Sequence, residues 1–101
     1  MTTKPKTVTP TPLRPEYLIQ GEIHISDAAD QTLDRAEIWK ALRRHTRGDW
    51  GDYAELCELA NAEALEQGLD WVSIYHDRHG TMFLIITTAD LSTTTVMLPF
   101  D

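Results

Sequence analysis

The feature that most constrains the fold is a change of apolar periodicity at Gly68. Before this residue, apolar residues recur every three or four positions, which is typical of amphipathic helices. After it, they alternate in short runs separated by turn residues, which is typical of strands. Helices followed by strands predict an α+β domain, with a helical hairpin packed on one face of a small antiparallel sheet.

The first predicted helix begins at Asp34 and ends near Gly48. Asp34 and Glu37 have the spacing of a capping box, in which each side chain accepts a hydrogen bond from a free backbone N–H. The apolar positions at helical spacing are Ile38, Ala41, Leu42 and His45. This stripe predicts the helix face that packs on the sheet.

A second helix is predicted from Asp52 to Gly68, after a short connector at 48–51. Asp52 and Glu55 repeat the capping-box spacing. The apolar stripe of this helix is Tyr53, Leu56, Cys57, Ala60 and Ala64. Two helices joined by so short a connector predict an αα-hairpin.

Strands are predicted before and after the two helices in the sequence. The first lies around Gly21, at 17–19 and 22–25, and Asp27 to Asp30 reads as a turn after it. Three strands follow the helices, at residues 71–76, 82–88 and 93–98. The middle one is apolar on both faces and is expected at the centre of the sheet. The last is expected at an edge, where an open strand could pair with a second copy and form a homodimer. The predicted order is β-α-α-β-β-β.

The first sixteen residues differ in composition from the rest of the chain. Residues 1–15 contain four of the five prolines and five threonines. Proline fixes φ and removes hydrogen-bond donors, and few large apolar residues are present to drive burial. We therefore expect a flexible tail at 1–16 and a single domain at 17–101.

The charge distribution limits the classes of partner. The formal net charge is −7, yet residues 1–15 hold only Lys4, Lys6 and Arg14, so residues 16–101 carry −10. An acidic body repels a phosphate backbone, which argues against direct nucleic-acid binding. It suits a protein partner with a basic surface.

Membrane insertion, disulfides, metals and cofactors are not expected. No apolar run reaches the roughly 18 residues needed to cross a bilayer, and the single Cys57 cannot form an internal disulfide. His76 and His79 lack the third and fourth ligands that a zinc site needs. No phosphate-binding or dinucleotide-binding motif is present. We expect a cytoplasmic protein without a cofactor.

The segment 45–52 is the most distinctive in the chain, because it combines two glycines, a tryptophan and two aspartates. One interpretation is a structural connector held in place by a buried tryptophan. The other is a binding site that brings the connector against the threonine-rich last strand. Its residues would be Arg47, Asp49, Trp50, Thr93 and Thr94.

Catalysis has no sequence signature here, so no catalytic residue is predicted for the leading hypothesis. An alternative hypothesis uses His45 as a general acid or base. Arg44 or Arg47 would then stabilise phosphate charge.

A resemblance extends over residues 44–99. The ordered motifs RHTRGDWG, SIY, IITTAD and STTTVMLP resemble a family of short, mostly uncharacterised proteins of plasmids, phages and other mobile elements. That family often carries arginine at two places that here hold Asp70 and Leu91, which argues against an anion-binding role. The order of elements also resembles toxin ribonucleases of the RelE and barnase-like type.

Two functions follow from these observations. The leading hypothesis is a non-catalytic protein-interaction module of a mobile element. Such a module could inhibit a host defence system of the restriction or CRISPR type by binding a basic protein surface. The alternative is a small toxin-like ribonuclease that uses His45 with Arg44 and Arg47, although such nucleases are usually basic where they meet RNA.

Overall fold

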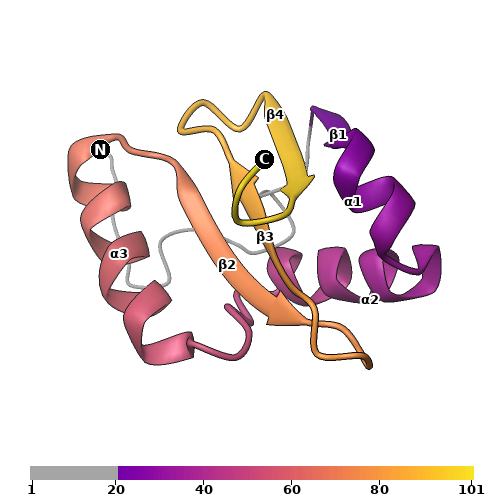
Figure 1. The fold of residues 1–101 in the computed structure, drawn as a ribbon. Coiled ribbons are helices and arrows are strands. Elements are labelled where there is room, and N and C mark those ends of the chain that lie inside the picture. Colours follow the sequence, from indigo (N-terminus) through magenta and orange to yellow (C-terminus); the bar gives the residue numbers. More distant parts are fainter. Residues whose placement is uncertain (1–20) are drawn as a thin grey trace.

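The computed structural model describes residues 21–101, and Figure 1 shows the arrangement of their elements. The predicted tail at 1–16 and the first part of the predicted first strand, at 17–19, lie outside these residues. The described elements are β1 (Glu22–Ile25), α1 (Asp27–Thr32), α2 (Arg35–Thr46), α3 (Ala54–Gln67), β2 (Trp71–His76), β3 (Met82–Thr87) and β4 (Thr93–Met97). The predicted α+β class is confirmed.

The four strands form one sheet in the order β1-β4-β3-β2. β2, β3 and β4 are antiparallel neighbours, as predicted, and β3 is central. β1 pairs with β4 in parallel, with Ile23 opposite Thr94, so the sheet is mixed and not antiparallel. The prediction of an open edge at β4 was therefore wrong, because β1 occupies that edge. This removes the argument for a homodimer through β4.

The turn predicted after β1 is a short helix, α1. Ser26 caps this helix, since its hydroxyl accepts a hydrogen bond from the Ala29 N–H. Asp27 and Asp30 lie in its first turn, where negative charge suits the helix dipole. Ala29 is fully buried and Leu33 nearly so, which ties α1 to the core. The prediction of a turn was wrong, because Ser26 caps a helix at this position.

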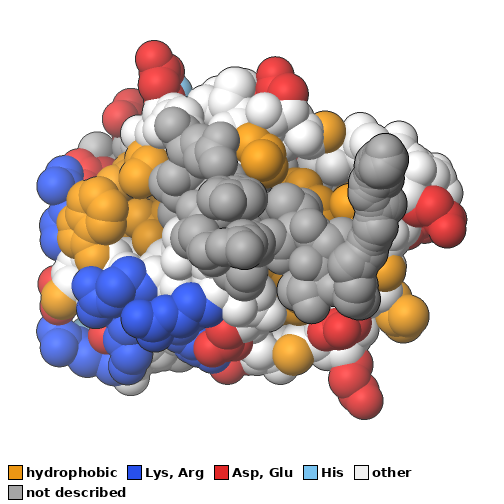
Figure 2. Space-filling model, turned by 180° about the vertical axis from the view of Figure 1, so that it is seen from behind, with side chains coloured by type: hydrophobic (Ala, Val, Ile, Leu, Met, Phe, Trp, Pro, Cys, Tyr) orange, Lys and Arg blue, Asp and Glu red, His pale blue; other side chains and the backbone are white. Residues whose placement is uncertain are grey.

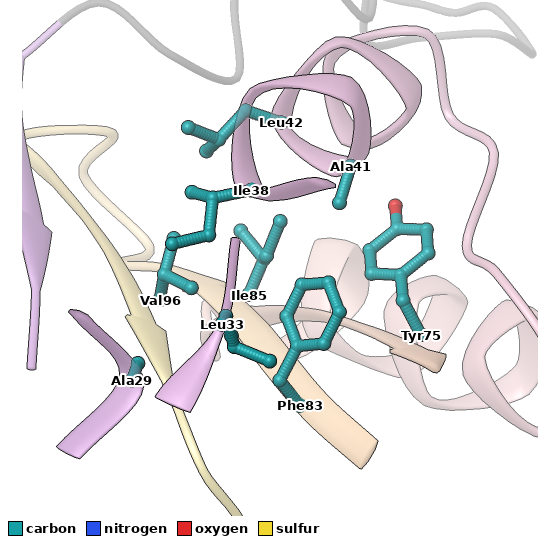
Figure 3. Close-up of a cluster of buried hydrophobic side chains, with 9 residues drawn as sticks. All are labelled: Ala29, Leu33, Ile38, Ala41, Leu42, Tyr75, Phe83, Ile85 and Val96. Atoms are coloured by element: carbon teal, nitrogen blue, oxygen red, sulfur yellow. The ribbon is translucent and has the colours of Figure 1, made fainter. Parts of the chain in front are cut away.

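α2 packs on one face of the sheet, and its predicted stripe is entirely buried. The cap is formed by Asp34, whose carboxylate accepts from the Ala36 N–H, while Glu37 accepts from the Arg78 N–H instead of completing the box. Figure 3 shows the resulting core, which joins α1, α2 and three strands. Its members are Ala29, Leu33, Ile38, Ala41, Leu42, Tyr75, Phe83, Ile85 and Val96.

α3 lies along β2 and does not form the predicted hairpin with α2 (Figure 1). The Asn61 side chain donates to the Val72 carbonyl oxygen at 2.8 Å and accepts from the Val72 N–H at 2.9 Å. An amide side chain offers both a donor and an acceptor, so it can replace a neighbouring strand at this position. Asp52 does not cap α3; its carboxylate accepts from the His76 backbone N–H. α3 therefore protects the outer edge of β2.

Candidate functional site

A buried chain of polar side chains connects α2 to the sheet. His45 Nδ1 lies 2.6 Å from Ser73 Oγ, and His45 Nε2 lies 2.9 Å from Thr87 Oγ1. Thr87 Oγ1 lies 2.8 Å from Thr94 Oγ1. All four side chains are almost fully buried. Because each ring nitrogen of His45 has a partner, the imidazole is held in one orientation and its desolvation is offset.

The environment of His45 keeps its ring neutral. Burial lowers the pKa of His45 to about 4, since a charged imidazole would lose its hydration. At neutral pH, one ring nitrogen donates a proton and the other accepts one. With no exposed surface and both nitrogens engaged, His45 has no contact left for a substrate. The geometry therefore gives no support to His45 as a general acid or base.

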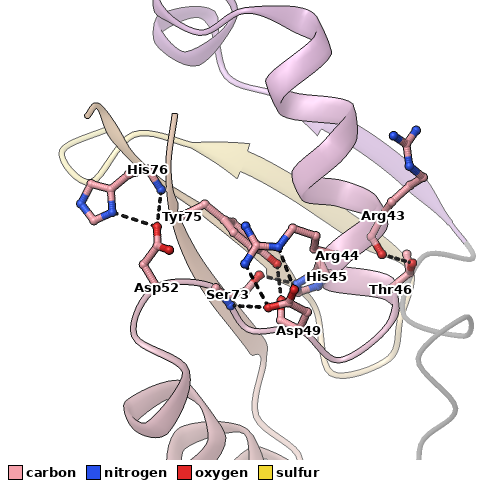
Figure 4. Close-up of polar contacts among 10 residues, drawn as sticks. Arg43, Arg44, His45, Thr46, Asp49, Asp52, Ser73, Tyr75 and His76 are labelled. Carbon is pink, nitrogen blue, oxygen red and sulfur yellow. Dashed lines mark hydrogen bonds and ion pairs between the residues drawn. The ribbon is translucent and has the colours of Figure 1, made fainter. Parts of the chain in front are cut away.

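The connector between α2 and α3 is held by Asp49, as Figure 4 shows. Its carboxylate accepts from Arg44 Nε at 2.8 Å and from Arg44 Nη2 at 3.2 Å, a two-pronged ion pair. The same carboxylate accepts from the Gly51 N–H, and the Asp49 carbonyl oxygen accepts from the Tyr75 hydroxyl. The Arg44 guanidinium also lies over the Tyr75 ring. Arg44 is thus a structural partner of the connector.

The charge states of Asp49, Arg44 and Tyr75 follow from these contacts. The hydrogen bond from Arg44 holds the pKa of Asp49 below its usual value, and the same bond raises the pKa of Arg44. Burial raises the pKa of the Tyr75 hydroxyl. All three groups therefore keep their ordinary charge states at neutral pH.

Gly51 lets the connector approach β2 closely. Its φ is +93°, and a Cβ built at this position would lie 2.0 Å from the Ile74 carbonyl oxygen. The Asp52 N–H donates to that oxygen, and the Ile74 N–H donates to the Trp50 carbonyl oxygen. Only glycine fits both the backbone conformation and the available space. The connector is therefore attached to the β2 edge by backbone hydrogen bonds.

Trp50 anchors the connector through contacts with two rings, those of Trp71 and His45. Its ring stacks on Trp71 at a centroid distance of 6.2 Å and meets His45 edge-on at 5.7 Å. It is half-buried. These contacts favour the interpretation of segment 45–52 as a connector pinned by a tryptophan.

The residues predicted as a binding site do not form one surface. Asp49 and Trp50 belong to the connector, and Thr94 belongs to the buried polar chain. Thr93 is half-buried beside the β3–β4 turn, where its N–H donates to Thr88 Oγ1. Arg47 is exposed at the end of α2. The structure thus separates these five residues into structural contacts and one exposed cation.

An exposed apolar surface lies on α3 instead. Leu56 is 62% exposed and Leu59 is 72% exposed. The four glutamates of α3 are exposed as well, and α3 carries no Lys or Arg. We call this surface the acidic leucine face; it comprises Glu55, Leu56, Glu58, Leu59, Glu63 and Glu66. The sequence signal for it was the presence of leucines on more than one side of the helix, which one buried stripe cannot accommodate.

A second exposed surface lies on α2, on the side opposite its buried stripe. Trp39 is 46% exposed, and the three cations beside it are exposed as well. We call this surface the basic tryptophan face; it comprises Trp39, Lys40, Arg43 and Arg47. Figure 2 shows Lys and Arg side chains gathered on the side where α2 lies, next to hydrophobic ones. The net charge of residues 16–101 is negative, so it does not reveal this local positive surface.

Within residues 21–101, no three His, Cys, Asp or Glu side chains are grouped so that they could hold a metal ion. His76 instead faces Asp52, with Nδ1 3.0 Å from the carboxylate. None of the helices described there is long and apolar enough to span a membrane.

Comparison with protein-family models, with curated proteins and with solved structures finds no match for this chain. The resemblance to short proteins of mobile elements therefore stays a prediction. The candidate site is defined by its geometry alone.

Proposed function

We propose that the chain is a non-catalytic protein-interaction module that binds a basic protein surface through the acidic leucine face of α3. The observation that carries this proposal is the exposure of Leu56 and Leu59 among four glutamates. Burying both leucines in an interface would stabilise a complex by about 25 cal/mol for each Å² of apolar area removed from water. The glutamates would speed the encounter and select a basic partner.

The glutamates of the acidic leucine face form no ion pair within residues 21–101, which supports this role. Across residues 21–101, the ion pairs that form use Asp30, Asp34, Asp49, Asp52 and Glu22. The four glutamates of the acidic leucine face take part in none of them. Their charge is therefore available to a partner and is not spent on holding the fold together.

The class of target comes from the sequence. The resemblance to proteins of mobile elements suggests a host defence complex, and the basic nucleic-acid channel of such a complex has the charge that this face would meet. This proposal keeps the expected cytoplasmic location, where such complexes act. Binding should weaken steeply with added salt, because the glutamates are exposed and their attraction is screened.

The proposal is tested by affinity capture from a lysate of the source cells with matched variants. The test variant is Leu56→Ser/Leu59→Ser, and the control is Leu65→Ser/Leu69→Ser, which changes two exposed leucines outside the face. We expect one stoichiometric partner with the wild type and the control, lost with the test variant and on raising the salt. Equal capture by all three proteins would contradict the proposal.

A further inference from the structure

Two exposed helix faces of this molecule are complementary in charge and in apolar content. The basic tryptophan face has three positive charges around Trp39, and the acidic leucine face has four negative charges around Leu56 and Leu59. Each face combines large exposed apolar groups with charges of one sign. Such a combination is uncommon on a surface that only contacts water.

Within residues 21–101, the three cations of the basic tryptophan face form no ion pair, and neither do the glutamates of the acidic leucine face. Among residues 21–101, the arginines in ion pairs are Arg35, Arg44 and Arg78. Lys40, Arg43 and Arg47 are not among them. They recur at spacings of three and four, so they lie on one side of the helix together with Trp39.

One molecule cannot join its own two faces. α3 lies at one end of the molecule in Figure 1, and α2 extends toward the other end beneath the sheet. In the reverse view of Figure 2, the cations gather on the α2 side and acidic and hydrophobic side chains occupy the opposite side. The core fixes α2 on the sheet and Asn61 fixes α3 on β2. Contact between the two faces therefore requires two molecules.

We propose that the basic tryptophan face of α2 binds the acidic leucine face of a second copy of this chain. This inference rests on the proposed function, because it uses the same acidic leucine face and adds a second basic surface that this face can bind. Trp39 packs against Leu56 and Leu59 of the second copy, and the three cations lie against its glutamates. The contact is heterologous, since it joins two different faces.

Charge and apolar content together favour a second copy over a nucleic acid as the occupant of the basic tryptophan face. Residues 16–101 carry −10, and a duplex presents one phosphate for about every 1.7 Å of its axis. The attraction of three cations for such a dense charge is opposed by the rest of the protein. Salt screens the distant charges beyond about 10 Å at 0.1 M for either occupant. A second copy also places Leu56 and Leu59 against Trp39, whereas the outside of a duplex presents phosphates.

The contact also has a consequence for the proposed function. A basic partner and a second copy occupy the same acidic leucine face. They therefore compete, and self-association reduces the concentration of free face available to the partner.

Sedimentation velocity of the full chain, over a range of protein concentrations at low and high salt, tests this inference. The wild type should show a mass that rises with concentration at low salt and falls to that of the monomer at high salt. The variants Lys40→Glu/Arg43→Glu/Arg47→Glu and Glu55→Lys/Glu63→Lys/Glu66→Lys should each be monomeric alone and associate when mixed. Trp39→Ser should weaken association at least about tenfold, the loss of about 1.4 kcal/mol, and Leu65→Ser should not.

The outcomes separate this inference from the proposed function. A wild type that stays monomeric at every concentration overturns self-association, while lysate capture that depends on Leu56 and Leu59 leaves the proposed function standing. If each of the two charge-reversal variants still self-associates when alone, the pairing of these faces is overturned. A monomeric protein that retards a labelled single-stranded oligonucleotide through Lys40, Arg43 and Arg47 overturns it as well, in favour of nucleic-acid binding.

Discussion

The two longer helices of this molecule use their apolar residues in opposite ways. α2 buries its whole stripe against the sheet and adds the polar contacts of His45. α3 buries only Cys57, Asn61 and Ala64, and the Asn61 amide makes two hydrogen bonds to β2. Its leucines stay largely in water. One helix therefore holds the fold together, while the other protects a sheet edge and exposes its leucines.

The largest expected effect is the loss of the His45 side chain. We expect His45→Ala to lower the free energy of unfolding by about 4 kcal/mol, because it leaves a cavity and removes the buried partners of Ser73 and Thr87. Urea denaturation followed by circular dichroism measures this. Arg47→Ala, on the same helix but exposed, should change the stability by less than about 0.5 kcal/mol. A loss of unfolding free energy in His45→Ala as small as that in Arg47→Ala would contradict the role of α2 as the helix that holds the fold together.

A pair of leucines compares the helices directly. Leu42 is 2% exposed on α2 and Leu59 is 72% exposed on α3. Leu42→Ala should cost about 3 kcal/mol of unfolding free energy, the usual range for a buried leucine. Leu59→Ala should cost less than about 0.5 kcal/mol. Similar costs in the two variants, measured by the same denaturation, would contradict the contrast.

Acid should lower the free energy of unfolding through protonation of His45 before it protonates the carboxylates of the ion pairs. The pKa of His45 falls from 6.5 to about 4 on folding, so the unfolded chain binds more protons between these values. The contribution of neutral His45 to the free energy of unfolding is complete above pH 6.5. It is lost as the pH falls toward 4, by about 3 kcal/mol in total. Denaturation at a series of pH values measures the slope, and His45→Asn should lack it. An equal slope in that variant would assign the effect to other groups.

The edge contact of α3 should have a smaller effect. Asn61→Ala removes both hydrogen bonds to Val72 and should cost about 2 kcal/mol. Hydrogen exchange should then accelerate at the Val72 amide more than at the amides of β3. Unchanged protection at Val72 would show that α3 does not depend on this contact.

Much of the fold was predictable because local signals agreed with the final structure. The stripe from Ile38 to His45 predicted the buried face of α2, and the alternation after Gly68 predicted β2, β3 and β4. Ser26 is a cap signal for α1, and the prediction of a turn at 27–30 does not take it into account. The parallel pairing of β1 with β4 depends on contacts about 70 residues apart, which no local pattern encodes.

The candidate site was less predictable than the fold. The sequence identified His45, Asp49 and Trp50 as unusual, and their role proved to be structural. The predicted buried stripe of α3 includes Leu56, which a hairpin with α2 would cover. Asn61 prevented that arrangement, because its amide ties α3 to the edge of β2. Which side of α3 faces water depends on this tertiary contact and not on helix periodicity.

Photo-crosslinking in cells tests the central claim most directly. A photoreactive phenylalanine analogue placed at position 59, on the acidic leucine face, is compared with the same analogue at Gln31, which is exposed on α1. Our account predicts discrete protein adducts from position 59 that decrease when Leu56→Ser is added, and none of these adducts from position 31. The absence of any adduct from position 59, or the same adducts from both positions, would contradict the claim that α3 presents a binding surface.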